Sequence, residues 1–167
     1  RHDTPKLIKD MQARLLDCLS QAGDLAECRQ SAALLLDIVE DYRLRLREGR
    51  VSAEELAITF NLSKAPEHYV AESIQTLAAR QLSSAGIKLH AGETVRYIIT
   101  SAKDSVKEWR AKPLALLDGP LEYDVKKYLD FVERAAAEIL EGLVAAVHKP
   151  KPRLSELELP FSWQGPS

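Results

Sequence analysis

The sequence is poor in the residues from which metal centres and disulfide frameworks are built. Its 167 residues include two cysteines, Cys18 and Cys28, and four histidines. The cysteines form no CxxC pair and the histidines show no HxxxH or HExxH spacing, so we expect neither a metal site nor a disulfide scaffold. We interpret both cysteines as small apolar residues that are buried in the core.

Long apolar runs and an excess of one charge are also missing. No segment approaches the roughly 20 apolar residues that cross a bilayer, and no charged segment followed by an apolar one opens the chain. Lysine and arginine number 23 against 25 aspartate and glutamate, which gives a net charge of −2. We therefore expect a cytoplasmic protein without a membrane partner. A protein that coats nucleic acid with its whole surface is excluded, although a local basic patch is not.

Motifs for catalysis are absent as well. The sequence has no glycine-rich phosphate loop, no GxSxG and no pairing of a nucleophile with a base. We expect this chain to catalyse nothing by itself, which speaks against a free-standing hydrolase or transferase. The chain opens with Arg1-His2-Asp3-Thr4 and its only methionine is Met11, so we expect it to be a piece of a longer polypeptide.

Apolar residues at helical spacing predict a set of long helices. The first is expected from Thr4 to Gly23, the second from Asp24 to Gly49, and the last from Asp124 to Pro150. The Thr4 hydroxyl and a capping box at Asp24–Glu27 are expected to accept the free backbone N–H groups of the first two helices. The second helix ends in four arginines, which we interpret as a solvated helix end: Arg43, Arg45, Arg47 and Arg50.

The pattern changes between the second and the last of these helices. Ser52-Ala-Glu-Glu55 is a capping box for a short helix. Residues 56–62 and 94–100 alternate with period two, which predicts a pair of strands. Another helix is predicted from Pro66 to Leu82, with Gly86 as its left-handed stop. The expected fold is mainly α with a small β element of two or three strands.

The segment Ile58–Tyr69 carries the polar groups that best suit a binding site. It places Thr59, Ser63, Lys64 and Tyr69 around a strand-to-helix junction. Hydroxyls and amides at such a junction, with one lysine, hold a phosphodiester backbone without reading its bases. From the residues alone, the alternative is an ordinary capped turn.

The order of these pieces resembles the thumb region of family B DNA polymerases. That region has an I-T-K-x-L-x-x-Y pattern before a helix, then a Gly, G-[DE]-x-[VI]-x-Y-[VI]-I and Y-D-x-x-Y-Y. The corresponding segments here are Ile58–Tyr69, Gly86, Gly92–Ile99 and Tyr123–Tyr128, and Arg1-His2-Asp3-Thr4 resembles the R-R-D-x that follows the palm. The resemblance covers residues 1–145. His2, Phe60-Asn61 and Ser73-Ile74-Gln75 depart from the family pattern.

The resemblance implies a mostly helical thumb that closes over the minor-groove side of a primer–template duplex. It implies that this chain holds no cofactor, and that catalytic Mg²⁺ lies in a palm ahead of Arg1. The implied partners are primer–template DNA and the palm and fingers of the same polymerase, in a nucleoid-associated location. Because any base sequence must be held, the contacts should go to phosphates and weaken with salt.

The residues expected to contact DNA are Lys64, Ser63, Thr59, Tyr69, Arg80 and Arg96, with Arg1 near the primer end. Several of them have an alternative role. Tyr69, like Tyr97, suits a ring that packs in the core, and Arg80 suits a solvated helix residue. The net charge of −2 predicts weak binding of DNA by this chain alone.

We divide the chain into a thumb-like helical domain, 1–148, and a tail, 149–167. The segment Glu156-Leu-Glu-Leu-Pro-Phe161 resembles the Q-L-x-L-P-[LF] peptide by which bacterial polymerases attach to their sliding clamp. A sliding clamp is therefore an expected partner, through Glu156, Leu157, Leu159 and Phe161. The alternative is that the apolar side chains of the tail, with Trp163, fold back onto the helices.

A second interpretation of the whole chain is a helical protein–protein interaction module. In that case Arg43–Arg50 and the apolar tail bind protein partners. A metal-binding acidic motif ahead of Arg1 would favour the polymerase instead.

Overall fold

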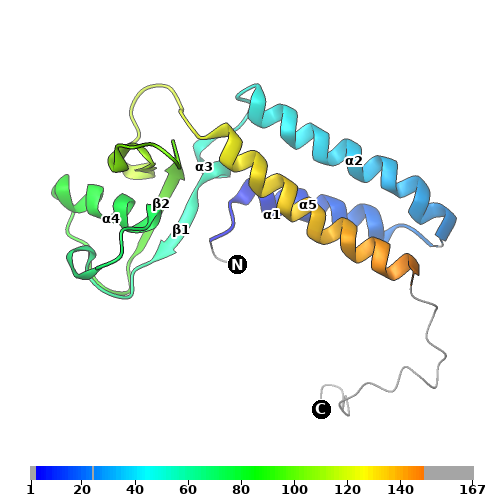
Figure 1. Cartoon of the computed structure of the whole chain (residues 1–167), viewed down its shortest axis with the longest axis horizontal. Helices are drawn as coiled ribbons and strands as arrows, with labels where there is room; N and C mark the ends of the chain where they lie inside the picture. Colours follow the sequence, from blue (N-terminus) through cyan, green and yellow to red (C-terminus); the bar gives the residue numbers. More distant parts are fainter. Residues whose placement is uncertain (1–2, 24, 149–167) are drawn as a thin grey trace, which may run out of the picture.

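The computed structural model of the chain describes residues 3–23 and 25–148. Long helices lie side by side at one end of the molecule, and a small sheet lies at the other (Figure 1). The helical end contains α1 (Lys6–Ser20), α2 (Leu25–Arg47) and α5 (Val125–His148). The sheet end contains β1 (Ile58–Asn61), β2 (Thr94–Ile99), β3 (Ala111–Pro113) and α4 (Ile74–Ser84). The short helix α3 (Ala53–Leu56) comes between α2 and β1, and the 3₁₀ turns are η1 (Pro66–His68), η2 (Lys107–Trp109) and η3 (Leu114–Leu116).

The helical end buries one apolar stripe on each of its three long helices. Each of α1, α2 and α5 contacts the other two. Burying one leucine, isoleucine or valine side chain contributes about 1.5–3 kcal/mol, so these stripes account for the packing of the bundle. The stripes are Leu7, Ile8, Met11 and Leu15 on α1, Leu35, Val39, Tyr42 and Leu46 on α2, and Tyr128, Val132 and Ala136 on α5.

Two of the predicted helix caps are confirmed. Ser52 and Glu55 form a reciprocal capping box at the start of α3. At the start of α5, Oδ1 of Asp124 accepts the backbone N–H of Lys127 at 2.9 Å. The other carboxylate oxygen of Asp124 accepts the N–H of Ala102 at 2.8 Å, so this cap also fixes the connection that follows β2.

The start of α1 differs from the prediction. Pro5 occupies the cap position, and no side chain bonds to the free N–H groups there. Thr4 lies one residue too early to cap a helix that begins at Lys6, so the predicted Thr4 cap is wrong. The predicted cap of α2, Asp24, lies outside the described residues.

The predicted pair of strands is confirmed and gains a third member. Within the described residues the sheet has the order β1-β2-β3, and both neighbouring pairs are antiparallel. Ile58 lies opposite Tyr97, and Tyr97 lies opposite Pro113. The fold is therefore mainly α with a small three-stranded element, as the sequence predicts.

The helix predicted from Pro66 to Leu82 is interrupted. One 3₁₀ turn, η1, is followed by an extended residue, Tyr69, with φ −81° and ψ 120°. The helix α4 then begins separately at Ile74, because Ser73 and Thr76 form a second capping box at its N-terminus. Gly86, with φ +87°, terminates the segment in the left-handed conformation that the sequence predicts.

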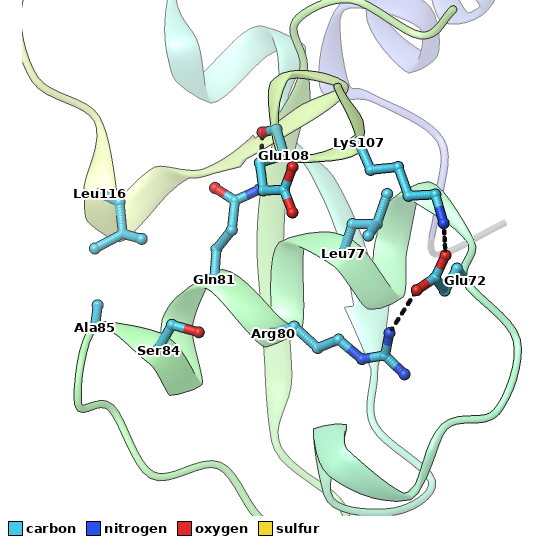
Figure 2. Close-up of a pocket in the computed structure, with 9 residues that line it drawn as sticks. All are labelled: Glu72, Leu77, Arg80, Gln81, Ser84, Ala85, Lys107, Glu108 and Leu116. Atoms are coloured by element: carbon cyan, nitrogen blue, oxygen red, sulfur yellow. Dashed lines mark hydrogen bonds and ion pairs between the residues drawn. The ribbon is translucent and has the colours of Figure 1, made fainter. Parts of the chain in front are cut away.

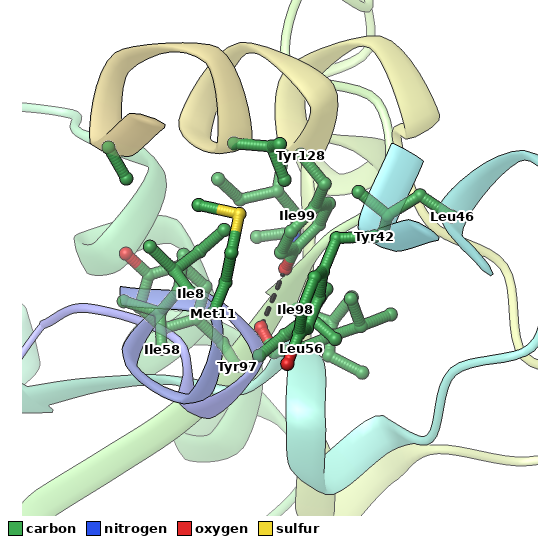
Figure 3. Close-up of a cluster of buried hydrophobic side chains, with 14 of the residues drawn as sticks. Ile8, Met11, Tyr42, Leu46, Leu56, Ile58, Tyr97, Ile98, Ile99 and Tyr128 are labelled. Carbon is green, nitrogen blue, oxygen red and sulfur yellow. Dashed lines mark hydrogen bonds between the residues drawn. The ribbon is translucent and has the colours of Figure 1, made fainter. Parts of the chain in front are cut away.

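The two ends of the molecule share one core at their junction (Figure 3). The Tyr128 hydroxyl on α5 accepts the N–H of Ile99 on β2 at 3.1 Å and donates to the carbonyl of Leu56 on α3 at 2.8 Å. Three elements that are distant in sequence are thus joined by one buried phenol. The edge of the Tyr123 ring packs against it at 6.0 Å between centroids, so the sheet is fixed relative to the bundle.

The remaining structural expectations concern the cysteines and the membrane. Cys18 is only partly buried against the core, because it lies at the edge of the buried stripe of α1. The side chain of Cys28 lies outside what the structure describes. Among the described residues, no helix combines the length and the apolar character needed to cross a bilayer.

Candidate nucleic-acid interface

The loop after β1 brings together three of the residues that the sequence assigns to DNA. The Tyr69 hydroxyl accepts the backbone N–H of Ser63 at 2.9 Å and lies 3.1 Å from the Ser63 hydroxyl. The Lys64 ammonium lies 5.0 Å from the centroid of the Tyr69 ring, within cation–π range. The Phe60 ring packs on the same tyrosine at 6.0 Å. Tyr69 therefore contacts both Ser63 and Lys64, through its hydroxyl and its ring respectively.

The electrostatics of this loop favour an anion. Ser63 and Lys64 are both exposed. Within the part of the chain that the structure describes, no carboxylate forms an ion pair with Lys64. The hydrogen bond from the Ser63 side chain lowers the pKa of the Tyr69 hydroxyl, and the Lys64 charge adds to the effect. A cation and a hydroxyl thus face solvent together, held in place by a tyrosine.

A second group of predicted residues lies on one face of the sheet. Thr59 and Arg96 are direct partners in the register of β1 and β2. The two-residue period of a strand puts Asn61 and Thr94 on the same face, and the Thr94 hydroxyl donates to Oδ1 of Asn61 at 3.0 Å. Thr59 is half-buried, whereas the other members are exposed. This face presents polar side chains to solvent just before the loop that carries Lys64.

Arg96 already has an acidic partner. Its guanidinium bonds to Glu54 of α3 at 2.5 Å, and this bond lowers the pKa of the Glu54 carboxyl. The Arg96 side chain is 44% exposed and that of Glu54 66%. Exposed pairs of this kind contribute little to stability, so a phosphate is able to compete with Glu54 for the arginine.

Arg80 is engaged within the protein. Its Nη2 donates to the Tyr69 carbonyl at 2.5 Å, and its Nη1 lies 3.4 Å from Glu72. Lys107 of η2 bonds to the same carboxylate and lowers its pKa. These groups line a cleft of about 580 Å³ between α4 and η2, in which Glu72 joins the two cations (Figure 2). The alternative of a freely solvated Arg80 does not hold, and its contact with DNA stays a prediction.

The other predicted residues separate into two groups. Tyr97 is a core ring with 5% of its surface exposed. Tyr69 is half-buried, so it is both a packing ring and part of the loop. Arg1 and the predicted clamp peptide, with Glu156, Leu157, Leu159 and Phe161, lie outside the described residues, as does the whole tail 149–167.

The arginines at the end of α2 are more ordered than a solvated helix end. Arg43 holds Glu133 of α5 with two bonds of 2.6 and 2.7 Å, and Arg45 bonds to Glu55 at 2.6 Å. Arg47 and Arg50 pair with Glu40 and Glu48. Each of these arginines therefore has a carboxylate partner within the protein, and the pairs of Arg43 and Arg45 are the less exposed ones.

The sequence reasoning missed the carboxylates that neutralise predicted contacts. Glu54 stands in the capping box of α3, but its partner Arg96 is 42 residues away and follows only from the strand register. Glu72 meets Lys107 across 35 residues with no local signal. In the described residues, no group of three or more His, Cys, Asp or Glu side chains is suited to hold a metal ion. We therefore derive no metal-dependent step for this chain.

Comparison with known proteins gives one consistent answer. Residues 1–143 match the family model described as DNA polymerase family B. DNA polymerase 2 of Aeropyrum pernix is 30% identical over 142 residues, which cover 84% of this chain and 17% of that polymerase. The DNA polymerase of Methanocaldococcus jannaschii is 28% identical over 130 residues, or 78% of this chain and 7% of the relative.

The fold agrees with these sequence matches. The structure of the family B DNA polymerase from the hyperthermophilic archaeon Pyrobaculum calidifontis superimposes with a TM-score of 0.70 at 28% identity, over 83% of this chain and 18% of that chain. The present chain thus spans less than a fifth of the length of these relatives. With its sequence matched from the first residue almost to the end of α5, and its fold shared, this chain belongs to DNA polymerase family B.

Proposed function

We propose that this chain is the thumb of a family B DNA polymerase and holds the primer–template duplex by its phosphates. The observation that carries the proposal is the loop after β1. There, the exposed Lys64 ammonium lies over the Tyr69 ring, and the Ser63 hydroxyl lies 3.1 Å from the hydroxyl of the same tyrosine. A point charge with neighbouring hydroxyl donors suits a phosphodiester oxygen and carries no information about the base.

The sheet face with Thr59 and Arg96 extends this surface toward α3. The face is polar and exposed, and it leads directly into the loop that carries Lys64. We assign Lys64, Ser63 and Thr59 to phosphate contacts, and Arg96 to a contact that competes with Glu54. The net charge of −2 limits the affinity of the isolated chain, because most of the counterion release must come from elsewhere.

The remaining partners follow from the same assignment. The palm and fingers of the same polymerase would supply the rest of the duplex contacts, and membership of the family implies that the catalytic Mg²⁺ would be held in the palm. The tail segment Glu156–Phe161 remains our proposal for a sliding-clamp contact. The interaction-module alternative rests on Arg43–Arg50, which have carboxylate partners, and on the apolar tail, which lies outside the described residues; the family match favours the polymerase.

Duplex binding by the Lys64→Ala variant tests the proposal. The chain is titrated into two fluorescent primer–template duplexes of unrelated sequence, at a series of salt concentrations starting from low ionic strength. Loss of one phosphate contact should lower the slope of log K against log salt by about 0.9. It should weaken binding to both duplexes equally. Lys126→Ala, which removes an exposed lysine from the first turn of α5, is the matched control. An unchanged affinity and slope in Lys64→Ala would contradict the assignment.

A further inference from the structure

The loop between β1 and α4 is fixed at its two ends by backbone and capping bonds. At the start, Leu62 exchanges two backbone bonds with the turn before β2, donating to Glu93 at 2.8 Å and accepting from Gly92 at 2.7 Å. At the end, Ser73 begins the capping box of α4. Between these points, η1 has backbone bonds of its own and Pro66 is buried, whereas the side chains of Ser63, Lys64 and Tyr69 are placed by their contacts with one another.

Arg80 provides the link from a rigid helix to that middle part. It follows Ala78 and Ala79, which are fully buried in α4. Its Nη2 donates to the Tyr69 carbonyl at 2.5 Å, across 11 residues of sequence. The guanidinium is therefore attached to the peptide whose side chain supports Ser63 and Lys64.

A second layer of contacts holds Arg80 in this orientation. Glu72 lies between the Arg80 guanidinium and the Lys107 ammonium, both of which point toward it across the cleft (Figure 2). The turn that carries Lys107 is itself tied to α4, since the Gln81 amide donates to the carbonyls of Glu108 and Ala111 at 3.2 and 2.8 Å. Only 34% of the Arg80 side chain is exposed, and its two terminal nitrogens already have partners inside the protein.

We propose that Arg80 is a positioning residue for duplex binding and does not itself contact a phosphate. The inference rests on the proposed function of the Lys64 loop. Arg80 fixes the Tyr69 main chain, the Tyr69 hydroxyl fixes the Ser63 amide, and the Tyr69 ring sets the place of the Lys64 ammonium. Removing Arg80 thus weakens binding through Lys64, in contrast to a direct contact, which acts independently of it.

A double-mutant cycle with Lys64 separates these two roles, because residues that act through one another are not additive. Duplex affinity and its salt slope are measured for the 167-residue chain, Arg80→Ala, Lys64→Ala and the double variant. If Arg80 acts by positioning, Arg80→Ala should lower the duplex affinity of the wild-type chain severalfold. In the Lys64→Ala background the same substitution should change the affinity less than twofold. The slope of the double variant should equal that of Lys64→Ala. Arg134→Ala, which removes a 71% exposed arginine of α5, controls for the loss of one charge.

The result that overturns the inference is additivity. If Arg80 contacts a phosphate, the salt slope of the double variant should be about 0.9 lower than that of Lys64→Ala. Its duplex affinity should also be lower than that of Lys64→Ala. Tyr69→Phe provides a further test, because it removes the hydroxyl that holds Ser63 and leaves both charges in place. This variant should weaken binding severalfold with Lys64 present, and in Lys64→Ala it should cause only the smaller loss that belongs to the Ser63 contact. If Tyr69→Phe has no effect on the wild-type chain, the inference is wrong even where Arg80→Ala fails to fold.

The same measurements distinguish this inference from the proposed function. If Lys64→Ala leaves affinity and slope unchanged, the proposed function fails and the positioning role fails with it. If Lys64→Ala behaves as expected and Arg80→Ala is additive, only the positioning role fails.

Discussion

The hydroxyl of Tyr128 donates a 2.8 Å hydrogen bond to the carbonyl oxygen of Leu56, a residue 72 positions earlier in the chain. The Tyr128 hydroxyl oxygen also accepts the backbone N–H of Ile99, and both Tyr128 and Leu56 have no exposed surface. One phenol therefore satisfies two buried backbone groups where the helical bundle meets the sheet.

Tyr128→Phe should destabilise the chain. The ring and its packing remain, but the Ile99 amide and the Leu56 carbonyl both lose a partner in a dry site. An unsatisfied buried polar group costs about 1–3 kcal/mol, so we expect a decrease in the free energy of unfolding of about 2 kcal/mol. Urea unfolding followed by circular dichroism measures it. Tyr123→Phe is the matched control, because its hydroxyl bonds to the Leu46 carbonyl in a partly buried site, and its loss should cost less.

Stability should also fall at high pH, because burial raises the pKa of two tyrosines, Tyr97 and Tyr128. Burial, with a contribution from the Asp3 charge, raises the pKa of Tyr97 from 10.0 to about 12. The unfolded chain then loses this proton before the folded chain does. The stabilisation is complete below pH 10.0 and is lost as pH rises from there to about 12.

The size of this loss of stability follows from the difference between the pKa of Tyr97 in the folded chain and that in the unfolded chain. One pKa unit corresponds to about 1.4 kcal/mol, so Tyr97 contributes on the order of 2 kcal/mol to the change. Burial raises the pKa of Tyr128 as well, which steepens the decline. Urea midpoints measured between pH 9 and pH 12 should decrease, and Tyr97→Phe should flatten the curve. A flat curve in the wild-type chain would show that Tyr97 ionises freely in the folded state.

Arg43 and Glu133 should show a measurable coupling between α2 and α5. Two parallel bonds of 2.6 and 2.7 Å join them, and this bidentate geometry is the strong form of an ion pair. Their side chains are 26% and 52% exposed, so solvent screening limits the gain to about 0.5–1 kcal/mol. A double-mutant cycle with Arg43→Met and Glu133→Gln, followed by urea unfolding, measures the coupling. It should decrease in 1 M salt, where the Debye length is about 3 Å; a coupling that is insensitive to salt would argue against an electrostatic origin.

The sequence predicts the parts of this fold whose signals are local. The Ser52–Glu55 capping box, the Asp124 cap and the strand pair within 56–62 and 94–100 each follow from a short pattern, and each is confirmed. β3 escaped prediction because a three-residue strand, Ala111–Pro113, is too short to show a period. The break after η1 escaped because the capping box at Ser73 has Thr76 in the place usually taken by Glu or Gln.

In the candidate site, too, contacts between residues close in sequence were predictable and contacts between distant residues were not. Ser63, Lys64 and Tyr69 lie close together in the sequence, and the structure brings them together around the Tyr69 ring. The partners of Arg80 and Arg96 depend on elements that meet only in the folded chain. The sequence therefore identifies which charges are present, but not which of them an internal carboxylate already neutralises.

Glu54 should act as an internal competitor for the duplex. Its carboxylate holds Arg96 at 2.5 Å, and the bond from Arg96 keeps its pKa below the usual value, so it stays ionised at neutral pH. Glu54→Gln removes the charge and frees Arg96 for a phosphate. We expect severalfold tighter binding of a primer–template duplex and a salt slope steeper by up to about 0.9.

The gain from Glu54→Gln should depend on Arg96. In an Arg96→Ala background the same change should have no more effect than Glu141→Gln, which removes an exposed carboxylate from α5. Titrations of a fluorescent duplex at several salt concentrations measure all four variants. Equal gains with and without Arg96 would mean that Glu54 acts only through the general field of the protein. Arg96 would then have no part in holding DNA, and the phosphate contacts would be confined to Lys64, Ser63 and Thr59.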